Sequence, residues 1–461
     1  MASINETVFN YPNFGPSVEG EFLRSETMAE RSGGLQGANL EQTRTINRRA
    51  VFEAVRRHGP ITRAELAGHI GLTVQGISNI ATELEEAGLI RQEGKRVGQR
   101  GQPAVELSVD PTGGYTIGLS LAYGHVTGVL VDLAGGIVAQ QDHRLKERAP
   151  KATVQALQTL AKSLLKQAKV SESQVWGIGC SVPGTVQNGA FWYDKVQEGD
   201  EWHKFPLAPE LENLTGFRVL VENDATVAAI GESLYGAGRA APSFFYLHFN
   251  LGIGGGLVVD RHPYRGAFGG AGEIGHLIVK PGGRPCPCGS RGCLEQYVSL
   301  YSAAETICGP ERTPDEVPVE EVVEFLRNRD PRILAWQQEA GQYLKIAIRN
   351  IEAVFDPDTI VIGGGLPQEM MDGLIAAASP LLPSMMHRRA GTLPRLMPAE
   401  HASERPALGA AALPMAMLLQ PDTGNAAWSA PTEKVRKRVN KALVMLGVNF
   451  AGASSHADRA H

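Results

Sequence analysis

Three cysteines and one histidine crowd into a short glycine-rich stretch, and this cluster constrains the fold more than any other sequence feature. Cys286, Cys288 and Cys293 have the spacing C-x-C-x4-C, and His276 lies ten residues before the first of them. Three thiolates and one imidazole form a donor set that suits a closed tetrahedral zinc site. Because the protein would fill all four positions, no site remains for a catalytic water, and we predict a structural zinc ion.

A less specific interpretation exists for each of these residues taken alone. A lone histidine is commonly a hydrogen-bonded structural side chain, and a lone cysteine a small buried apolar group. Four potential ligands within 18 residues favour zinc over that interpretation. The remaining two cysteines, Cys180 and Cys308, have no partners nearby in the sequence, and we expect both to pack in the core.

Composition excludes several classes of protein. The chain has 461 residues, enough for several domains, and a formal net charge of -5, so contact with nucleic acid must be local. Five cysteines are too few for a disulfide framework. No apolar run is long enough to span a membrane, and the first 40 residues lack a secretory signal. We expect a cytoplasmic protein without membrane contact.

Turn residues divide the chain. The cluster DPTGG at 110–114 separates a helical segment, 41–110, from a longer segment of strands and helices, 111–420. Residues 1–40 are polar without a sustained apolar period, and we expect a disordered tail. Residues 421–461 predict a second, flexible tail with one short amphipathic helix, Val435 to Leu446.

The segment 41–110 predicts three helices and a hairpin. The first helix runs from about Glu41 to His58, and Thr62 and Glu65 have the spacing of a capping box that starts the second. A tight turn at 71–73 leads to a third helix, which ends near Gly88. Two strands then surround a glycine-rich tip, the wing. This order is that of a winged helix-turn-helix.

Polar and basic residues of this segment suit DNA. Residues 91–103 contain four basic residues and one acidic residue. The glycines of this stretch allow its backbone to approach phosphates closely. Amide and hydroxyl groups on the third helix can read base edges. The candidate DNA-binding residues are Thr73, Gln75, Ser78, Asn79, Lys95, Arg96 and Arg100. The alternative is an oligomerisation bundle. A module this weakly charged needs a dimer to bind a specific operator tightly.

The segment 111–420 alternates strands with helices. It predicts a hairpin at 115–133, a long helix at 151–170 and buried strands ending in SVPG, END, GIGGG and TIVIGGG. Mixed strands with glycine turns and intervening helices predict an α/β fold in two lobes around a cleft.

These motifs, in this order, resemble the ROK family of repressors, open reading frames and sugar kinases. The most specific stretches are GEIGH at 272–276 and CPCGSRGCLE at 286–295. The resemblance implies a two-lobed actin-like ATPase (ribonuclease H-like) fold of the sugar-kinase type, with sugar bound between the lobes. It implies sugar contacts from Asn223, Asp224, Glu273, His276 and Glu295. In kinases of the family the residue at the position of Asp224 is the general base.

The chemistry of these residues suits a sugar independently. Carboxylates and amides pair with the hydroxyl groups of a polyol, and a wrong sugar leaves such groups unpaired. The alternative is that Asn223 and Asp224 merely cap the following helix. The two roles do not exclude each other.

The sequence departs from kinases of the family at the phosphate loops. Residues 120–124, SLAYG, lack the Asp, Gly pair and Thr of the first loop, and Asn250-Leu251-Gly252 replaces Gly-Thr-Gly of the second. Phosphoryl transfer depends on amides, hydroxyls and magnesium placed around the phosphates. We therefore expect a degenerate ATP site, although Asp224 and the glycines 363–365 persist.

Three functions remain in view. The first is a sugar-responsive transcriptional regulator of carbohydrate metabolism, a repressor and not an enzyme, which binds operator DNA and a sugar effector as a homodimer or homotetramer. The second is an ATP-dependent, glucokinase-like sugar kinase with an appended DNA-binding module. The third is a zinc-stabilised scaffold with a vestigial cleft.

Overall fold

The computed structural model describes residues 40–96, 104–122, 124–147, 149–187, 190–192, 201–202, 205–309, 311–384, 393–399, 405–419 and 441–447. Two compact units divide the chain, residues 1–44 and residues 45–461, and every contact discussed below lies within the second unit. The predicted N-terminal tail and most of the C-terminal one lie outside the described residues, so these boundaries stay predictions. None of the described helices is long and apolar enough to cross a lipid bilayer.

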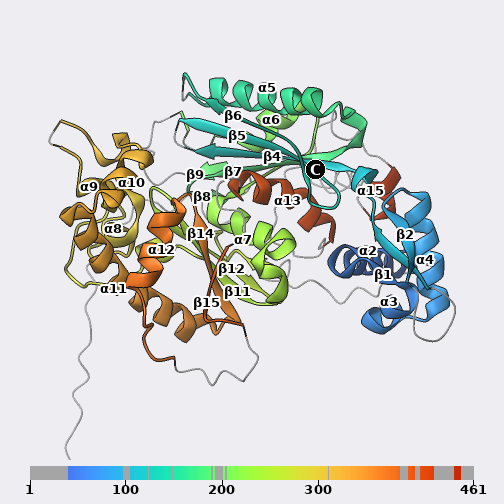
Figure 1. Ribbon diagram of the computed structural model, residues 1–461. Helices are drawn as coiled ribbons and strands as arrows, with labels where there is room; N and C mark the ends of the chain where they lie inside the picture. Colours follow the sequence, from blue (N-terminus) through green and yellow to red (C-terminus); the bar gives the residue numbers. More distant parts are fainter. Residues whose placement is uncertain are drawn as a thin grey trace, which may run out of the picture. The chain divides into compact units, whose positions relative to one another are not determined.

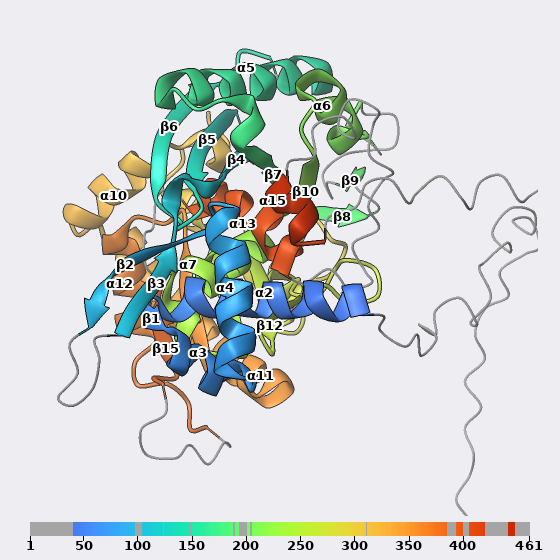
Figure 2. The same ribbon diagram turned by 90° about the vertical axis from the view of Figure 1, so that its right-hand side faces the viewer.

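The first elements form the predicted winged helix-turn-helix (Figure 2). They are α2 (Leu40–His58), β1 (Ile61–Thr62), α3 (Arg63–Ile70), α4 (Val74–Glu86), β2 (Ile90–Arg96) and β3 (Ala104–Val109), with sheet order β1-β3-β2. The capping box is present, because Thr62 Oγ1 accepts from the amide of Glu65 and the Glu65 carboxylate accepts from the amide of Thr62. Ile77, Ala81 and Leu84, at helical spacing on α4, are buried in one core with α2.

A five-stranded sheet follows, in the order β10-β7-β4-β5-β6. Its strands are β4 (Tyr115–Ala122), β5 (His125–Asp132), β6 (Ile137–Arg144), β7 (Val175–Val182) and β10 (Val219–Asn223). Helices α5 (Pro150–Ala168) and α6 (Leu207–Thr215) cover one face, and α13 (Arg405–Leu419) covers the other (Figure 1). A short pair, β8 (Thr185–Gln187) and β9 (Ala190–Trp192), lies beside β10.

A second five-stranded sheet has the order β13-β12-β11-β14-β15. Its strands are β11 (Phe244–Phe249), β12 (Ile253–Val259), β13 (His262–Tyr264), β14 (Thr359–Gly364) and β15 (Leu396–Pro398). Phe245, Leu247 and Phe249 share a core with α11 (Pro331–Phe355) and α12 (Gln368–Ala377). The alternate residues of β11, Phe244 and Tyr246, pack towards α7 (Asp224–Tyr235). Short helices α8 (Glu295–Val298), α9 (Leu300–Glu305) and α10 (Val319–Arg327) complete this lobe.

The two sheets repeat one topology. In each, the first three strands form an antiparallel meander, the fourth pairs in parallel with the first, and the fifth pairs in parallel with the fourth. A repeated order of this kind, with helices on both faces, is the arrangement expected of the two-lobed actin-like fold. The predicted α/β class is therefore confirmed.

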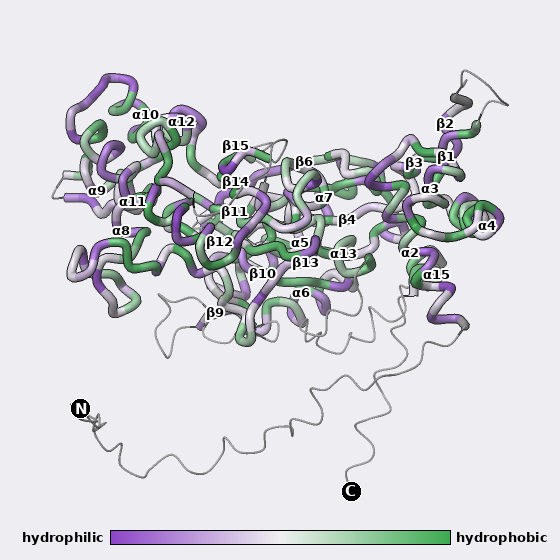
Figure 3. The backbone as a smooth tube through the Cα atoms, turned by 90° about the horizontal axis from the view of Figure 1, so that it is seen from below, coloured by the Kyte–Doolittle hydropathy of each residue, from purple (hydrophilic) through white to green (hydrophobic). Residues whose placement is uncertain are grey.

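Helices α7 and α13 contact each other and lie between the two sheets. Glycines permit this close packing: a Cβ atom on Gly118 of β4 or Gly179 of β7 would overlap a carbonyl oxygen of α13. Gly231 of α7 similarly faces Gly409 of α13. Figure 3 shows the hydrophobic segments gathered along the inner strands and α13. Small residues thus bring helix and strand backbones into contact at the centre of the molecule.

One strand of the first sheet was not predicted from the sequence, and part of the predicted C-terminal tail is packed. Strand β6 was not predicted because it is an edge strand whose Ile137 and Val138 are both exposed and whose other residues are mostly polar. Helix α15 (Lys441–Met445) lies within the short helix predicted at Val435 to Leu446, and its Leu443 and the following Leu446 are buried. Arg49 Nε of α2 donates to the carbonyl of Leu446 at 2.6 Å, so this part of the tail packs on the helix-turn-helix.

The packing of α13 yields a stability prediction. Gly179→Ala places a methyl group against the backbone of α13, and we expect it to lower the free energy of unfolding by about 1–3 kcal/mol, measured by urea denaturation. Gly68→Ala is the matched control, because a Cβ there meets no atom within 4 Å and removes flexibility from helix α3. Equal urea midpoints for the two variants would contradict the packing described.

Candidate functional site

The corner between β10 and α7 holds the first pair of predicted ligand-binding residues. Asn223 caps α7, because its Oδ1 accepts from the amides of Ala225 and Thr226 at 2.9 and 3.1 Å. Its Nδ2 donates to the carbonyl of Gly184, in the loop after β7, at 2.9 Å. The capping role considered as the alternative is thus present in the structure. The neighbouring Asp224 lies in the first turn of the helix.

A histidine that the sequence analysis did not select faces Asp224. His248 of β11 is buried, and its Nε2 lies 3.7 Å from Asp224 Oδ2. It shares a strand face with Tyr246, which points towards α7. Two sequence signals could have identified His248, namely the alternation of side-chain directions along β11 and the helix that starts at Asp224.

An ion pair ties a second loop to the same corner. Arg265, which follows β13, donates from Nε to Glu222 Oε2 at 2.6 Å. The other carboxylate oxygen of Glu222 accepts from the backbone amide of Asn223 at 3.0 Å. Sequence reasoning missed Arg265, because its partner lies 43 positions earlier and no spacing rule relates the two.

Glycines at the start of β12 lie close to both the corner and Glu295. A Cβ on Gly252 would lie 3.3 Å from Glu295 Oε2, and a Cβ on Gly254 would lie 2.9 Å from Ala225 Cβ. Gly252 directly precedes β12 and Gly254 is its second residue, so Glu295 and the first turn of α7 approach nearby positions of one chain segment.

His276 connects the remaining predicted residues. Its Nε2 lies 4.0 Å from Glu273 Oε2, and its Nδ1 lies 3.6 Å from Glu295 Oε1. Both carboxylates thus lie next to one imidazole, at the edge of the cysteine cluster. Of the five residues proposed from the resemblance, two lie at the corner between β10 and α7, Asn223 and Asp224. The other three lie around the cysteine cluster, namely Glu273, His276 and Glu295.

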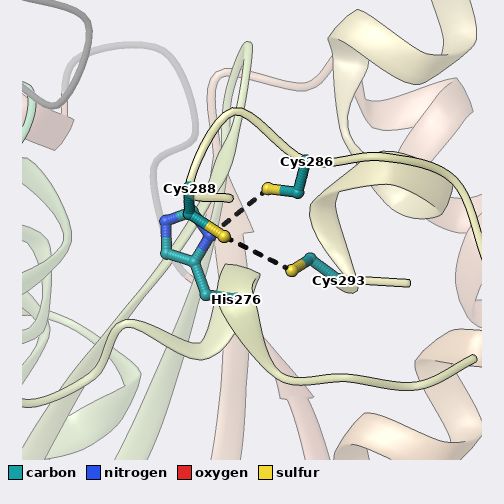
Figure 4. Close-up of side chains that lie close together, drawn as sticks. All are labelled: His276, Cys286, Cys288 and Cys293. Carbon is teal, nitrogen blue, oxygen red and sulfur yellow. Dashed lines mark hydrogen bonds between the residues drawn. The ribbon is translucent and has the colours of Figure 1, made fainter. Parts of the chain in front are cut away.

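His276, Cys286, Cys288 and Cys293 converge in space, and their ligand atoms all lie within 4.8 Å of one another (Figure 4). His276 Nδ1 is 3.6 Å from Cys286 Sγ, and Cys288 Sγ is 3.7 Å from Cys293 Sγ. Metal–sulfur bonds of about 2.3 Å and a metal–nitrogen bond of about 2.0–2.1 Å give tetrahedral edges of about 3.6 Å and 3.8 Å. The cluster therefore has the size of a four-coordinate metal site.

A local hydrogen bond lowers the pKa of one thiol of the cluster, and burial raises the pKa of the other two. The backbone amide of Ser290 stabilises the thiolate of Cys288 and lowers its pKa to about 7. Burial raises the pKa of Cys286 and of Cys293 above the ordinary value. A cation among the three sulfurs favours the thiolate form of all of them.

The other two cysteines lie elsewhere. Cys180 is buried in the core of the first sheet, and burial raises its pKa to about 12. Cys308 packs against the core of the second lobe. Both positions agree with the predicted packing role.

The helix-turn-helix presents neutral polar groups. Thr73 caps α4, and Gln75 and Asn79 are exposed and joined by a 3.1 Å hydrogen bond. Ser78 Oγ donates to the Val74 carbonyl. Lys95 and Arg96 stand at the end of β2, where their side chains are outside the described part, and Arg100 falls in the undescribed tip. Arg48 and Arg63 are paired with glutamates of α4.

Residues 116–416 match the pattern of the ROK family, over more than half of the chain. The chain belongs to the ROK family. Residues 42–99 match a Crp-like helix-turn-helix domain, and this combination places it in the transcriptional-regulator branch of the family.

Relatives fall on both branches of the ROK family. The "Xylose repressor" of Bacillus spizizenii is 27% identical over 369 residues, which are 79% of this chain and 93% of that protein. A "Glucokinase" of Halalkalibacterium halodurans is 35% identical over 240 residues, 49% of this chain and 70% of that one. The crystal structure of a ROK family transcriptional regulator, described as a homologue of the Escherichia coli Mlc protein, superposes with a TM-score of 0.64 at 24% identity. That match covers 81% of this chain and 96% of the other.

The residues at the positions of the two ROK phosphate loops are packed in the fold as follows. Ser120 is buried in β4, between Thr127 of β5 and Ser181 of β7. Leu251 packs against the core of the second lobe, and its carbonyl accepts from the amide of Tyr301 at 3.1 Å. Tyr123, within the first loop, lies outside the described residues.

A stability measurement distinguishes the helix cap made by Asn223 from the contribution of Asp224. Asn223→Ala removes the cap of α7 and the bond to Gly184, and we expect it to lower the free energy of unfolding by about 1–2 kcal/mol. Asp224→Asn keeps the cap, so its effect stays below about 1 kcal/mol. Urea unfolding checks both values, and an Asp224 variant as unstable as the Asn223 variant would refute the assignment of the cap.

Proposed function

We propose that this protein is a sugar-responsive, DNA-binding transcriptional repressor of carbohydrate metabolism. The observation that carries the proposal is the presence, in one compact unit, of a winged helix-turn-helix and a cluster of carboxylate, amide and imidazole groups beside a metal-sized cysteine site. The family membership and the repressor among its relatives support it.

The effector is a monosaccharide held by Asn223, Asp224, Glu273, His276 and Glu295. Carboxylates accept hydrogen bonds from sugar hydroxyls, and a buried polar group left unpaired by a wrong sugar supplies selectivity. When His276 turns Nδ1 towards the metal, its Nε2 side is available to Glu273 and to a sugar hydroxyl. The names of the relatives suggest pentoses and hexoses as the first candidates.

The metal is zinc, and its role is structural. His276, Cys286, Cys288 and Cys293 would hold it, and the match of the two measured edges to a tetrahedron supports this assignment. Bound zinc supplies a rigid anchor for the loop that carries Glu273 and Glu295. Because four protein atoms surround it, the ion has no open position for chemistry.

Operator DNA is bound by a pair of winged helix-turn-helix units, from a homodimer or homotetramer. The N-terminal part of α4, with Thr73, Gln75, Ser78 and Asn79, enters the major groove, and Lys95, Arg96 and Arg100 of the wing contact phosphates. The weak charge of the described face supports a requirement for two such units.

A second candidate function is sugar phosphorylation. Asp224 beside His248, and a glucokinase relative at 35% identity, favour it. The apolar Leu251 and the buried Ser120 weigh against an ATP site, so we propose that the chain is not an enzyme. Sugar-dependent ADP release from the purified protein, lost in Asp224→Asn with folding intact, would establish the kinase instead.

DNA binding tests the repressor proposal. A duplex selected by the protein from a random library should bind with sequence preference, and its affinity should fall as salt rises, since basic wing residues displace counterions. Thermal-shift screening of monosaccharides first identifies stabilising sugars. Such a sugar should then weaken DNA binding by about 5- to 150-fold in fluorescence anisotropy titrations. Binding that shows neither sequence preference nor a sugar effect would contradict the proposal.

Metal content tests the zinc site. Cys288→Ser removes one of four ligands, so the zinc bound per chain, measured by atomic emission, should fall well below one. Sugar affinity should fall with it, because the loop with Glu273 and Glu295 loses its anchor. Cys308→Ser, outside the cluster, is the control and should keep the full zinc content. Unchanged zinc in Cys288→Ser would remove the ligand assignment.

A further inference from the structure

Helix α7 starts at the proposed sugar site. Asn223 caps its first turn, and Asp224 is its first residue. The helix has 12 residues, which at 1.5 Å each span about 18 Å. A ligand bound at Asp224 therefore contacts the N-terminal end of α7 directly.

The other end of α7 contacts the helix-turn-helix. Arg56 of α2 donates from Nη1 to the carbonyl of Leu234, in the last turn of α7, at 3.0 Å. The side chain of Arg56 is only 5% exposed. Its Nε and Nη2 also donate to both carboxylate oxygens of Glu53, at 2.7 and 2.8 Å. Burial opposes the charge of Glu53, yet the bonds from Arg56 and Arg57 hold its pKa below the ordinary value.

A second bond reinforces this contact. Arg239, just beyond the end of α7, donates from Nη2 to the carbonyl of Arg57, the residue after Arg56, at 3.0 Å. Apolar packing accompanies both bonds, because Ile230 and Leu234 of α7 belong to the same core as Phe52 of α2. The last turn of α2 is thus held by the C-terminal end of α7.

Two sides of α7 pack closely against neighbouring backbone. A Cβ on Gly256 of β12 would lie 2.6 Å from the Ala225 carbonyl, and a Cβ on Gly409 of α13 would overlap the Val227 carbonyl. At these positions helix and strand backbones are in direct contact, while Val227, Ile230 and Leu234 on another face of α7 pack in the core shared with the helix-turn-helix. Sliding of packed helices is an established form of domain closure.

The helix-turn-helix has a separate attachment to the first sheet. The amide of Leu133, after β5, donates to the carbonyl of Pro111 at 3.2 Å, and Gly114 packs against the ring of Trp176 in β7. The helix-turn-helix and the linker that follows it therefore contact both α7 and the first sheet.

We propose that α7 transmits occupancy of the sugar site to the helix-turn-helix, and that Arg56, through the Leu234 carbonyl and Glu53, is the residue that couples the two. This inference rests on the proposed function and names the regulation of the same site. Arg56 acts as a positioning residue, which contacts neither sugar nor DNA. A ligand shifts DNA binding only by its different affinity for the two helix positions.

The test measures the coupling factor, the ratio of DNA dissociation constants with and without saturating sugar. D-xylose and D-glucose are the probes, and the DNA is the duplex selected from the random library. In Arg56→Gln we expect the coupling factor to fall to within about twofold of one. Sugar affinity by calorimetry and DNA affinity without sugar should both stay within about threefold of the unaltered protein, which a merely structural role would not predict.

Arg48→Gln is the matched control. Arg48 lies on the same helix and makes an ion pair of the same length, 2.7 Å, but its partner is Glu83 within the helix-turn-helix. This variant should keep the full coupling factor. Arg56→Lys retains a charge beside Glu53 and should reduce the coupling less than Arg56→Gln. Arg239→Gln, a surface substitution, should reduce it as well if Arg56→Gln fails to fold.

The outcomes separate this inference from the proposed function. Coupling that survives unchanged in a folded Arg56→Gln, or in Arg239→Gln if Arg56→Gln fails to fold, overturns the role of α7 and Arg56. An equal fall of the coupling in Arg48→Gln overturns it as well. If neither sugar changes the DNA affinity of the unaltered protein, the proposed function fails first, and the inference fails with it.

Discussion

The backbone of α7 touches β12 on one side and α13 on the other, and this contact sets where Asn223 and Asp224 lie. Gly254 and Gly256 of β12 leave room for the first turn of the helix, so Asn223 and Asp224 come to lie beside the loop that carries Glu295. Larger residues at these glycines would push the helix away from the strand. The same helix ends at Arg56 of the helix-turn-helix. Close packing of glycine and alanine thus joins the ligand side of the molecule to its DNA side.

The cysteine cluster stabilises the other half of the site. The loop between His276 and Cys293 has little regular structure, apart from short bridges such as Ile278 with Cys293. Arg284 lies over the Tyr297 ring at 4.8 Å from its centroid, and its backbone amide donates to the Tyr297 hydroxyl. These contacts tie the loop to α8, but they leave the sulfurs close together. A metal ion at their centre would neutralise the thiolates and hold Glu273 and Glu295 in place.

Local patterns were predictable from the sequence, and contacts between distant segments were not. The capping box of Thr62 and Glu65 and the cysteine spacing each depend on a few neighbouring residues, and the structure contains both arrangements. His248 and Arg265 escaped notice because their partners lie in other strands and loops. Strand β6 escaped it because an edge strand need not alternate apolar and polar residues. The resemblance to the ROK family supplied the sugar-site residues, which no periodicity could have placed.

The central claim of this account is that sugar and DNA bind one protein in thermodynamic competition, and linkage makes that claim reciprocal. The most direct measurement is the dissociation constant of the sugar, by calorimetry, for the free protein and for the protein saturated with its selected duplex. The account predicts that DNA weakens sugar binding by the same factor by which the sugar weakens DNA binding. A sugar affinity that is identical with and without bound DNA would contradict it.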